Sequence, residues 1–247
     1  MLLDYRDVLI MKRVSQIDKV ILVAGGKGGV GKSVVAATTA LLLSKKFRTG
    51  LLDLDLHGPS SAAILGAENS PIEEADGIVP PTVDRLKLMS LDLLVKGRPI
   101  PLSGLSKQEV VKEIVALTDF GELDFLVVDL PPGSGDELLA SIRIFRSKAT
   151  TIIVTTPSAL SSSFAERVIT IMKSTSVPIF GIVENMSRKS DDSPTLELCQ
   201  RTGVTFLGRL PFDEIIARAG NITRDQLISS RFALSLQSIL NMTGLYR

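Results

Sequence analysis

The stretch Gly25–Ser33 reads GGKGGVGKS, and it stands between an apolar run, Val20–Ala24, and a segment, Val34–Lys46, whose pattern predicts a helix. Glycines let the backbone bend until several N–H groups face one anion, so a glycine-rich loop between a buried strand and a helix binds phosphate. Four residues meet the full P-loop spacing: Gly26, Gly31, Lys32 and Ser33. The sequence therefore predicts a nucleotide-binding P-loop.

The P-loop spacing assigns a role to its polar side chains. Lys32 is placed to neutralise the outer phosphates of a nucleotide, and the Ser33 hydroxyl is placed to ligate Mg²⁺. We expect a continuous run of residues to contact ATP or ADP: Gly26, Lys27, Gly28, Gly29, Val30, Gly31, Lys32, Ser33 and Val34.

Lys27 is a residue that an ordinary P-loop does not require. The string KGGVGKS resembles the deviant P-loop of the MinD/ParA group of ATPases. In that group the extra lysine reaches across a dimer interface to the partner's nucleotide, so the resemblance implies a catalytic Lys27 that acts in trans and a homodimer bridged through ATP. A solvated loop lysine is the alternative interpretation.

Composition limits the classes of protein. The chain has 247 residues, of which 45% are hydrophobic, and this suits one large α/β domain with a substantial core. Its 28 basic and 27 acidic residues nearly balance, so we expect no nucleic-acid or membrane partner. The single cysteine excludes an intramolecular disulfide, and the first residues lack a signal-peptide pattern, so we expect a cytoplasmic protein.

Short apolar runs alternate with helical patterns along the chain. The predicted strands are Val20–Ala24, Thr49–Leu52, Leu86–Ser90, Phe125–Asp129, Thr151–Thr155, Ile179–Val183 and Thr205–Leu210. The predicted helices are Val34–Lys46, Lys107–Leu117, Glu137–Arg146, Ala159–Ser174, Thr195–Arg201 and Arg231–Met242. This alternation predicts an α/β fold with a doubly wound, mostly parallel sheet flanked by helices.

We predict a single domain over residues 1–247, with residues 1–18 as an N-terminal lead and residues 230–247 as a C-terminal helix packed on the domain. Two segments rich in proline, glycine and charge, Glu68–Pro81 and Lys96–Ser106, are expected to be surface loops. Ligands of such sheets collect at the carboxyl ends of the strands, which is where the remaining motifs fall.

The segment 51–60, LLDLDLHGPS, ends a predicted strand in two aspartates. Alternate residues of a strand point the same way, so Asp53 and Asp55 can face a common Mg²⁺ and water. The MinD/ParA resemblance implies that Asp55 positions the attacking water and that Asp53 lies near the water shell of the metal. Each aspartate can instead cap the following turn. His57 precedes a Gly-Pro turn, and we assign it no catalytic role.

The segment 125–137, FLVVDLPPGSGDE, has the form of a Walker B strand. Four apolar residues lead to Asp129, whose carboxylate can hold a Mg²⁺-bound water. Gly133 and Gly135 leave backbone able to approach a γ-phosphate, so the following loop is a candidate switch. A rigid, proline-restricted turn is the alternative.

The motifs GKGGVGKS, DLDLHGPS, DLPPGSGDE, VTTP at 154–157 and GIVENMS at 181–187 follow one another in this order. Together they resemble the Mrp/ApbC family of iron–sulfur carrier ATPases within the MinD/ParA group, over approximately Val20–Pro211. The resemblance implies that Asn185 recognises adenine, and that a loop beginning with Pro211 and Phe212 closes around the base. A turn-forming role is the alternative for Asn185.

The chain departs from that family after ENMS. Carriers of this type have a C-x-x-C pair there, and two pairs across a dimer hold one cluster, whereas residues 187–195 read SRKSDDSPT. A homodimer offers only two Cys199 thiolates where a cluster usually needs four, so we expect no stable [4Fe–4S] centre. Cys199 falls in a short helical pattern, which favours a small core residue.

Two functions follow from these residues. The first is a slow, Mg²⁺-dependent ATPase of Mrp/ApbC type that works as an ATP-sandwich homodimer in iron–sulfur cluster assembly or transfer, with an iron–sulfur or other protein client. The second is an ATP-dependent dimerisation switch that regulates a protein partner and carries no cluster.

Overall fold

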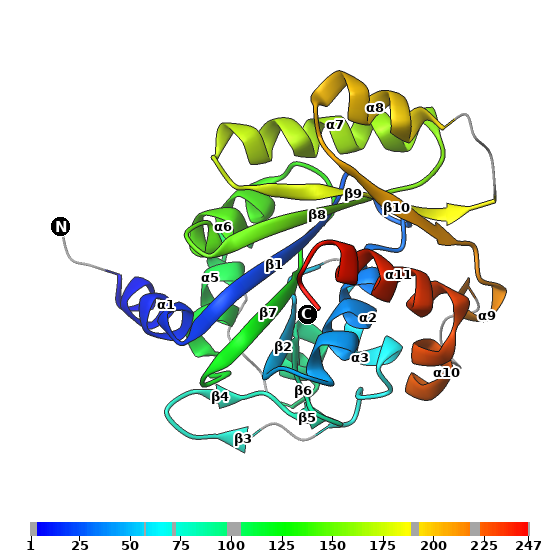
Figure 1. Cartoon of the computed structure of the whole chain (residues 1–247). Helices are drawn as coiled ribbons and strands as arrows, with labels where there is room; N and C mark the ends of the chain where they lie inside the picture. Colours follow the sequence, from blue (N-terminus) through cyan, green and yellow to red (C-terminus); the bar gives the residue numbers. More distant parts are fainter. Residues whose placement is uncertain are drawn as a thin grey trace.

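The computed structural model describes residues 4–56, 58–70, 73–97, 105–188, 193–217 and 223–246. Its main sheet has eight strands in the order β10-β9-β8-β1-β7-β2-β6-β5 (Figure 1). The strands are β1 (Ile17–Gly25), β2 (Thr49–Asp53), β5 (Thr82–Val83), β6 (Leu86–Ser90), β7 (Leu123–Asp129), β8 (Ala149–Thr155), β9 (Ile179–Ser187) and β10 (Phe206–Pro211). Only the β5–β6 pair is antiparallel, which confirms the predicted mostly parallel sheet.

Helices cover both faces of this sheet (Figure 1). One face packs against α1 (Tyr5–Ser15), α5 (Lys107–Leu117), α6 (Asp136–Phe145), α7 (Ala159–Ser174) and α8 (Pro194–Thr202). The other packs against α2 (Lys32–Ser44), α3 (Ser61–Ile64), α10 (Arg224–Ser229) and α11 (Arg231–Met242). Because strands between two helical layers are buried on both sides, β1, β2, β7 and β8 are nearly continuous in apolar residues.

The strand register brings the motifs to one edge of the sheet. Asp53, the last residue of β2, is paired with Asp129, the last residue of β7. On the other side of β7, Val23 of β1 is also paired with Asp129, so the P-loop begins directly beside the Walker B strand. The carboxyl ends of parallel strands therefore place the P-loop and both aspartates together, as expected for a doubly wound sheet.

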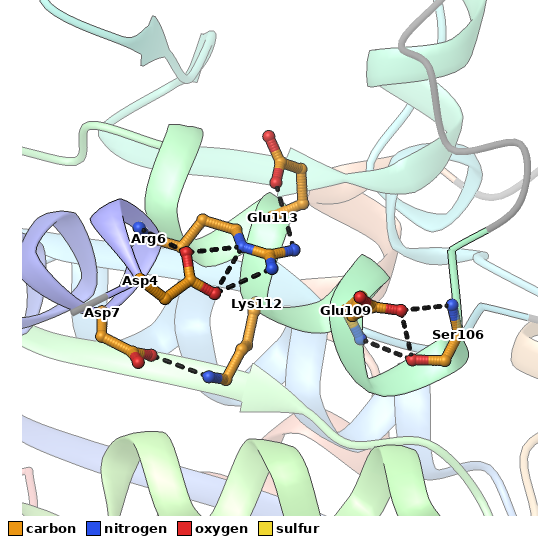
Figure 2. Close-up of polar contacts among 7 residues, drawn as sticks. All are labelled: Asp4, Arg6, Asp7, Ser106, Glu109, Lys112 and Glu113. Atoms are coloured by element: carbon orange, nitrogen blue, oxygen red, sulfur yellow. Dashed lines mark hydrogen bonds and ion pairs between the residues drawn. The ribbon is translucent and has the colours of Figure 1, made fainter. Parts of the chain in front are cut away.

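The structure differs from the sequence-based expectations at the start of the chain. Residues 5–15, expected to be part of an N-terminal lead, form helix α1. Figure 2 shows two contacts of this helix with α5: Asp7 pairs with Lys112 at 2.8 Å, and Arg6 lies 3.9 Å from Glu113. The buried Ile10 and Val14 pack α1 into the core. Asp4 caps α1 by accepting a hydrogen bond from the backbone N–H of Arg6.

Figure 2 also shows the start of α5, where the Ser106 and Glu109 side chains form a reciprocal capping box. This arrangement satisfies backbone N–H groups that the first turn of a helix leaves without partners. The partner helix of α1 therefore has a fixed starting point.

The expected surface loop 68–81 contains the small antiparallel pair β3 (Glu73–Glu74) and β4 (Ile78–Val79). Arg13 of α1 fixes this region, because its guanidinium pairs with Asp119 and donates to the Asp76 carbonyl oxygen. Of the other expected loop, 96–106, residues 98–104 lie outside the described residues.

The remaining short helices are α4 (Leu91–Gly97) and α9 (Glu214–Ala217), neither of which the sequence patterns predicted. At the other end of the chain, α11 packs against α2 and β10, as expected for the C-terminal helix. Within the described ranges, no helix combines the length and the apolar character needed to cross a membrane.

Candidate nucleotide site

The glycines of the P-loop serve two different purposes. A side chain on Gly26 would collide with the backbone of Phe164 in α7, its Cβ lying 2.3 Å from the carbonyl carbon. Gly31 has a left-handed φ of 82°, and its Cβ would lie 2.2 Å from the Asn185 amide nitrogen. Gly28 and Gly29, in contrast, are exposed with open space around them. The loop is therefore packed closely on its protein side and open where an anion would approach.

Helix α2 starts at Lys32 with Gly31 as its N-cap, and no side chain caps it. The N–H groups of its first turn and the positive end of the helix dipole are thus available to a phosphate. Val34 and Ser33 are half-buried in this first turn. The nucleotide contacts predicted from the sequence remain predictions, but their backbone geometry suits an anion.

Lys32 lies at the centre of the charged part of the site. Its side chain is only 5% exposed, and its Nζ lies 2.5 Å from Asp129 Oδ1 and 3.8 Å from Asp55 Oδ2. A buried ammonium requires such partners, because desolvation strongly disfavours an unpaired charge. The structure therefore brings together three of the side chains singled out in the sequence.

Asp129 is fully buried, and burial raises the pKa of its carboxyl group to about 6, although the nearby Lys32 ammonium lowers it and Asp53 adds a smaller upward contribution. One oxygen, Oδ2, has no hydrogen-bond partner among the described residues. A buried acceptor without a partner is costly, so this oxygen suits a ligand or a metal-bound water. Together with the Ser33 hydroxyl, it provides the oxygen donors that Mg²⁺ prefers.

Asp53 is also fully buried, but its carboxylate is already engaged by backbone groups. Oδ1 accepts from the Asp55 N–H, and Oδ2 accepts from the N–H groups of Ser60 and Ser61, each at 3.0 Å. Asp53 therefore fixes the turn that carries Asp55, which is the capping alternative raised from the sequence. Its placement near a metal's water shell remains a prediction.

The turn fixed by Asp53 leaves Asp55 partly accessible, with 14% of its side chain exposed. Asp55 Oδ1 accepts from the Gly58 N–H at 3.3 Å, while Oδ2 faces Lys32. A carboxylate at the rim of the phosphate site is placed where it can reach a water molecule. The neighbouring His57, to which no catalytic role was assigned, lies outside the described residues.

The loop after Asp129 and Lys27 of the P-loop also belong to the region around the site. Gly133, in the loop after Asp129, has a left-handed φ of 86°, and its N–H donates to the carbonyl oxygen of Gly25 at 3.2 Å. The candidate switch loop therefore rests on the first residue of the P-loop. Lys27 is half-buried and directly precedes the exposed Gly28 and Gly29 of the P-loop.

A pocket of about 230 Å³ adjoins the P-loop on the β9–β10 side. Its lining is mostly apolar and consists of Gly29, Gly31, Val34, Asn185, Met186, Pro211, Phe212, Asp213, Ile216 and Phe232. Asn185 is buried, and its Nδ2 donates to the Val30 carbonyl oxygen at 2.9 Å. Asn185, Pro211 and Phe212, which were expected to surround the base, thus lie around one pocket.

Sequence reasoning missed three further lining residues, Met186, Ile216 and Phe232. Met186 belongs to the ENMS motif, but nothing in the sequence shows its left-handed backbone, with a φ of 58°. Phe232 falls within the predicted helix Arg231–Met242, and its side chain lies in the core and also lines the pocket. The helical pattern predicted burial but not proximity to the site.

A parallel sheet, a P-loop between β1 and α2, and a carboxylate at the end of the neighbouring strand define a P-loop NTPase. The family model described as ParA, NUBPL iron-transfer P-loop NTPase, matches residues 16–242. The chain belongs to this family.

Curated relatives agree with the family assignment. The chain is 37% identical over 219 residues to the human cytosolic Fe-S cluster assembly factor NUBP2, a match that covers 81% of each protein. It is 36% identical over 218 residues to the iron-sulfur cluster carrier protein of Pyrococcus furiosus, which covers 78% of this chain and 74% of the relative.

Solved structures show the same fold. A nucleotide-binding protein from Archaeoglobus fulgidus, solved in complex with ADP, superposes with a TM-score of 0.76 at 29% identity and covers 92% of this chain and 95% of its own. The septum site-determining protein MinD of Pyrococcus horikoshii gives a TM-score of 0.68 at 20% identity, with 91% of this chain and 95% of its own covered, which shows the shared fold alone.

Proposed function

We propose that this chain is a slow, Mg²⁺-dependent ATPase that serves iron–sulfur cluster assembly as an ATP-bridged homodimer. The observation that carries the proposal is the position of Lys32, which lies between Asp129 and Asp55 beneath an open P-loop. Membership of an iron-transfer NTPase family, with relatives named as cluster assembly factors and carriers, supplies the cellular context.

The pocket supports adenine as the base. A carbonyl oxygen only accepts hydrogen bonds, so the Asn185 group that faces the Val30 oxygen must be the amide nitrogen. The remaining Oδ1 of Asn185 is an acceptor, to which the exocyclic amine of adenine can donate. ATP is therefore the nucleotide we infer for this site.

Phosphate chemistry is assigned to the charged cluster. Lys32 leaves Asp129 to contact the outer phosphates, and the loop N–H groups stabilise charge on the transferred phosphoryl group. Mg²⁺ would be held by Ser33 and, through water, by Asp129, and it would supply positive charge that neutralises the phosphates of the nucleotide. Asp55 orients the attacking water, a role that acts mainly in the transition state.

Two features support a dimer that covers the open side of the P-loop. Lys27 is half-buried next to the exposed Gly28 and Gly29, and we infer that it contacts a nucleotide bound by a second copy. Leu160, at the start of the α7 helix that packs on Gly26, is 61% exposed. Single exposed apolar side chains are common on protein surfaces, so Leu160 supports an interface only in combination with Lys27.

The chain itself offers few ligands for an iron–sulfur cluster. Its single cysteine, Cys199, lies half-buried on α8, and burial, with a further contribution from Glu184, raises the pKa of the thiol. A raised pKa disfavours the thiolate that binds iron. Together with the absence of a C-x-x-C pair from the sequence, this observation favours the second candidate, an ATP-dependent dimerisation switch that regulates a protein partner and carries no cluster.

Two measurements on the purified chain test the proposal. Hydrolysis of Mg²⁺-ATP, lost in Lys32→Ala, tests the ATPase. Anaerobic reconstitution with iron and sulfide, followed by absorbance and metal counting, tests the cargo. We expect turnover without a stable cluster on the homodimer; about four irons per dimer, lost in Cys199→Ser, would instead show that this chain carries the cluster itself.

A further inference from the structure

The outer wall of the base pocket is an aromatic ring covered by a cation. Phe212 lines the pocket and is 36% exposed. The Arg188 guanidinium carbon lies 4.8 Å from the centre of the Phe212 ring. At this distance the positive guanidinium is attracted to the negative face of the ring. The Phe212 ring therefore both lines the base pocket and contacts the Arg188 guanidinium group.

The two residues lie just beyond the paired ends of two neighbouring strands. Pro211 of β10 is in register with Ser187 of β9, and the Phe212 N–H donates to the Ser187 carbonyl oxygen at 3.2 Å. Arg188 follows Ser187 directly, and Phe212 follows Pro211. The side-chain contact between Arg188 and Phe212 therefore lies one residue beyond the last paired residues of the two strands. Among the residues that the structure describes, β10 is the edge strand of the sheet, with β9 as its one neighbouring strand.

The backbone around this contact is irregular. Met186 has a left-handed φ of 58°, a conformation that is uncommon for a residue other than glycine. The β9–β10 register also shifts between Arg209 and Pro211. The backbone hydrogen bonds between β9 and β10 therefore restrain the Phe212 ring only weakly, and the contact with Arg188 adds a restraint on the ring.

We propose that Arg188 is a positioning residue for the nucleobase, because its guanidinium holds the Phe212 ring as a fixed wall of the base pocket. The inference rests on the proposed binding of ATP and adds a residue to that site. A fixed wall reduces the conformational freedom lost when the base enters, so it increases affinity for the base without contacting the phosphates. The phosphate contacts predicted for the P-loop do not involve Arg188.

The test compares two ligands, ATP and inorganic tripolyphosphate, each titrated with Mg²⁺ into the full chain by calorimetry. Arg188→Met keeps much of the side-chain length but removes the charge. We expect it to weaken ATP binding about two- to fivefold and to leave tripolyphosphate binding unchanged. Arg188→Lys should retain part of the ATP affinity, because an ammonium also interacts with an aromatic face.

Two controls separate positioning from a general charge effect. Arg201→Met removes an exposed arginine on α8 and the same unit of charge, and it should leave both affinities unchanged. In a Phe212→Leu background, Arg188→Met should cause no further loss, because the ring that it holds is gone.

The outcomes are distinguishable. An equal loss of ATP and tripolyphosphate affinity in Arg188→Met, an unchanged ATP affinity, or a full additional loss in the Phe212→Leu background would overturn the inference while ATP binding stands. Failure of the wild-type chain to bind ATP would overturn the proposed function and this inference together.

Discussion

The phosphate site and the contact between α1 and α5 both depend on ion pairs, but the two regions place them differently. Lys32 and Asp129 are 5% and 0% exposed, whereas Lys112 and Asp7 are 35% and 43% exposed (Figure 2). Exposed pairs contribute little to stability, and buried pairs are costly to desolvate. We propose that the buried pair serves the binding of an anionic ligand, whereas the exposed pairs help to orient a helix.

The largest effect is expected from a substitution in the buried ion pair of Lys32 and Asp129. Lys32→Ala leaves the loop N–H groups but removes the buried ammonium group at the P-loop, so ATP affinity should fall by about 100-fold or more. Titration calorimetry measures this, with Lys45→Ala, an exposed lysine just beyond α2, as the control. Near-normal ATP affinity in Lys32→Ala would contradict the assigned role.

Asp55→Ala separates hydrolysis from binding in the same cluster. A carboxylate that orients water contributes mainly in the transition state, so turnover should fall by about 100-fold or more while Mg²⁺-ATP stays bound. The ATP-bound dimer should then accumulate, as seen by light scattering. Unchanged turnover would remove Asp55 from the mechanism.

Lys27→Ala tests whether the open side of the loop is completed by a second copy. The variant should bind ATP as a monomer nearly as well as the wild type, but it should neither dimerise with ATP nor hydrolyse it. Calorimetry and size-exclusion chromatography with light scattering give the two readouts. A loss of monomer binding equal to that of Lys32→Ala would exclude the assignment in trans.

The raised pKa of Asp129 gives the buried cluster a pH dependence. Below about pH 6 the carboxyl group becomes protonated and loses the charge that attracts a Mg²⁺-bound water. The gain in ATP affinity on adding Mg²⁺ should therefore be present above this pH and decline as the pH falls through it. In Asp129→Asn the phosphates of ATP still titrate, but the Asp129 carboxyl group is absent. The gain in ATP affinity on adding Mg²⁺ should therefore be small for this variant at every pH. Identical profiles for both proteins would contradict the interpretation.

The smallest effect is expected from the exposed side. Lys112→Met removes the ion pair with Asp7, and the free energy of unfolding should fall by less than about 1 kcal/mol, with the difference reduced by added salt. Arg13→Met provides the contrast within the same helix, since Arg13 is buried and holds Asp119 and the Asp76 carbonyl; we expect a loss of about 2 kcal/mol or more. Similar losses for both variants in urea unfolding would contradict the comparison.

The parts of the fold that sequence predicts best are those whose signal is local. Each predicted strand lies within or close to an observed one, because burial on both faces requires continuous apolar runs such as that of β7. Helix α1 was missed because buried Arg13 interrupts its apolar stripe. The partners that permit its burial, Asp119 and Asp76, lie far away in the chain.

The same distinction applies to the site. P-loop spacing identified Lys32, and the strand-end pattern identified Asp129, but their direct contact spans 97 residues and depends on strand register. The engagement of Asp53 by backbone N–H groups was one of two interpretations of the sequence, and it depends on the path of the turn that follows. Arg188 over Phe212 had no sequence signal, because the contact depends on the pairing of two strand ends.

The central claim is that ATP is hydrolysed in a site completed by a second copy of the chain. The most direct measurement is the ATP turnover per protein molecule, followed as the protein is diluted about a hundredfold at saturating Mg²⁺-ATP. A site completed across a dimer predicts that turnover per molecule falls on dilution as the dimer dissociates, and that Lys27→Ala is inactive at every concentration. Turnover per molecule that stays constant on dilution, with Lys27→Ala as active as the wild type, would contradict the account.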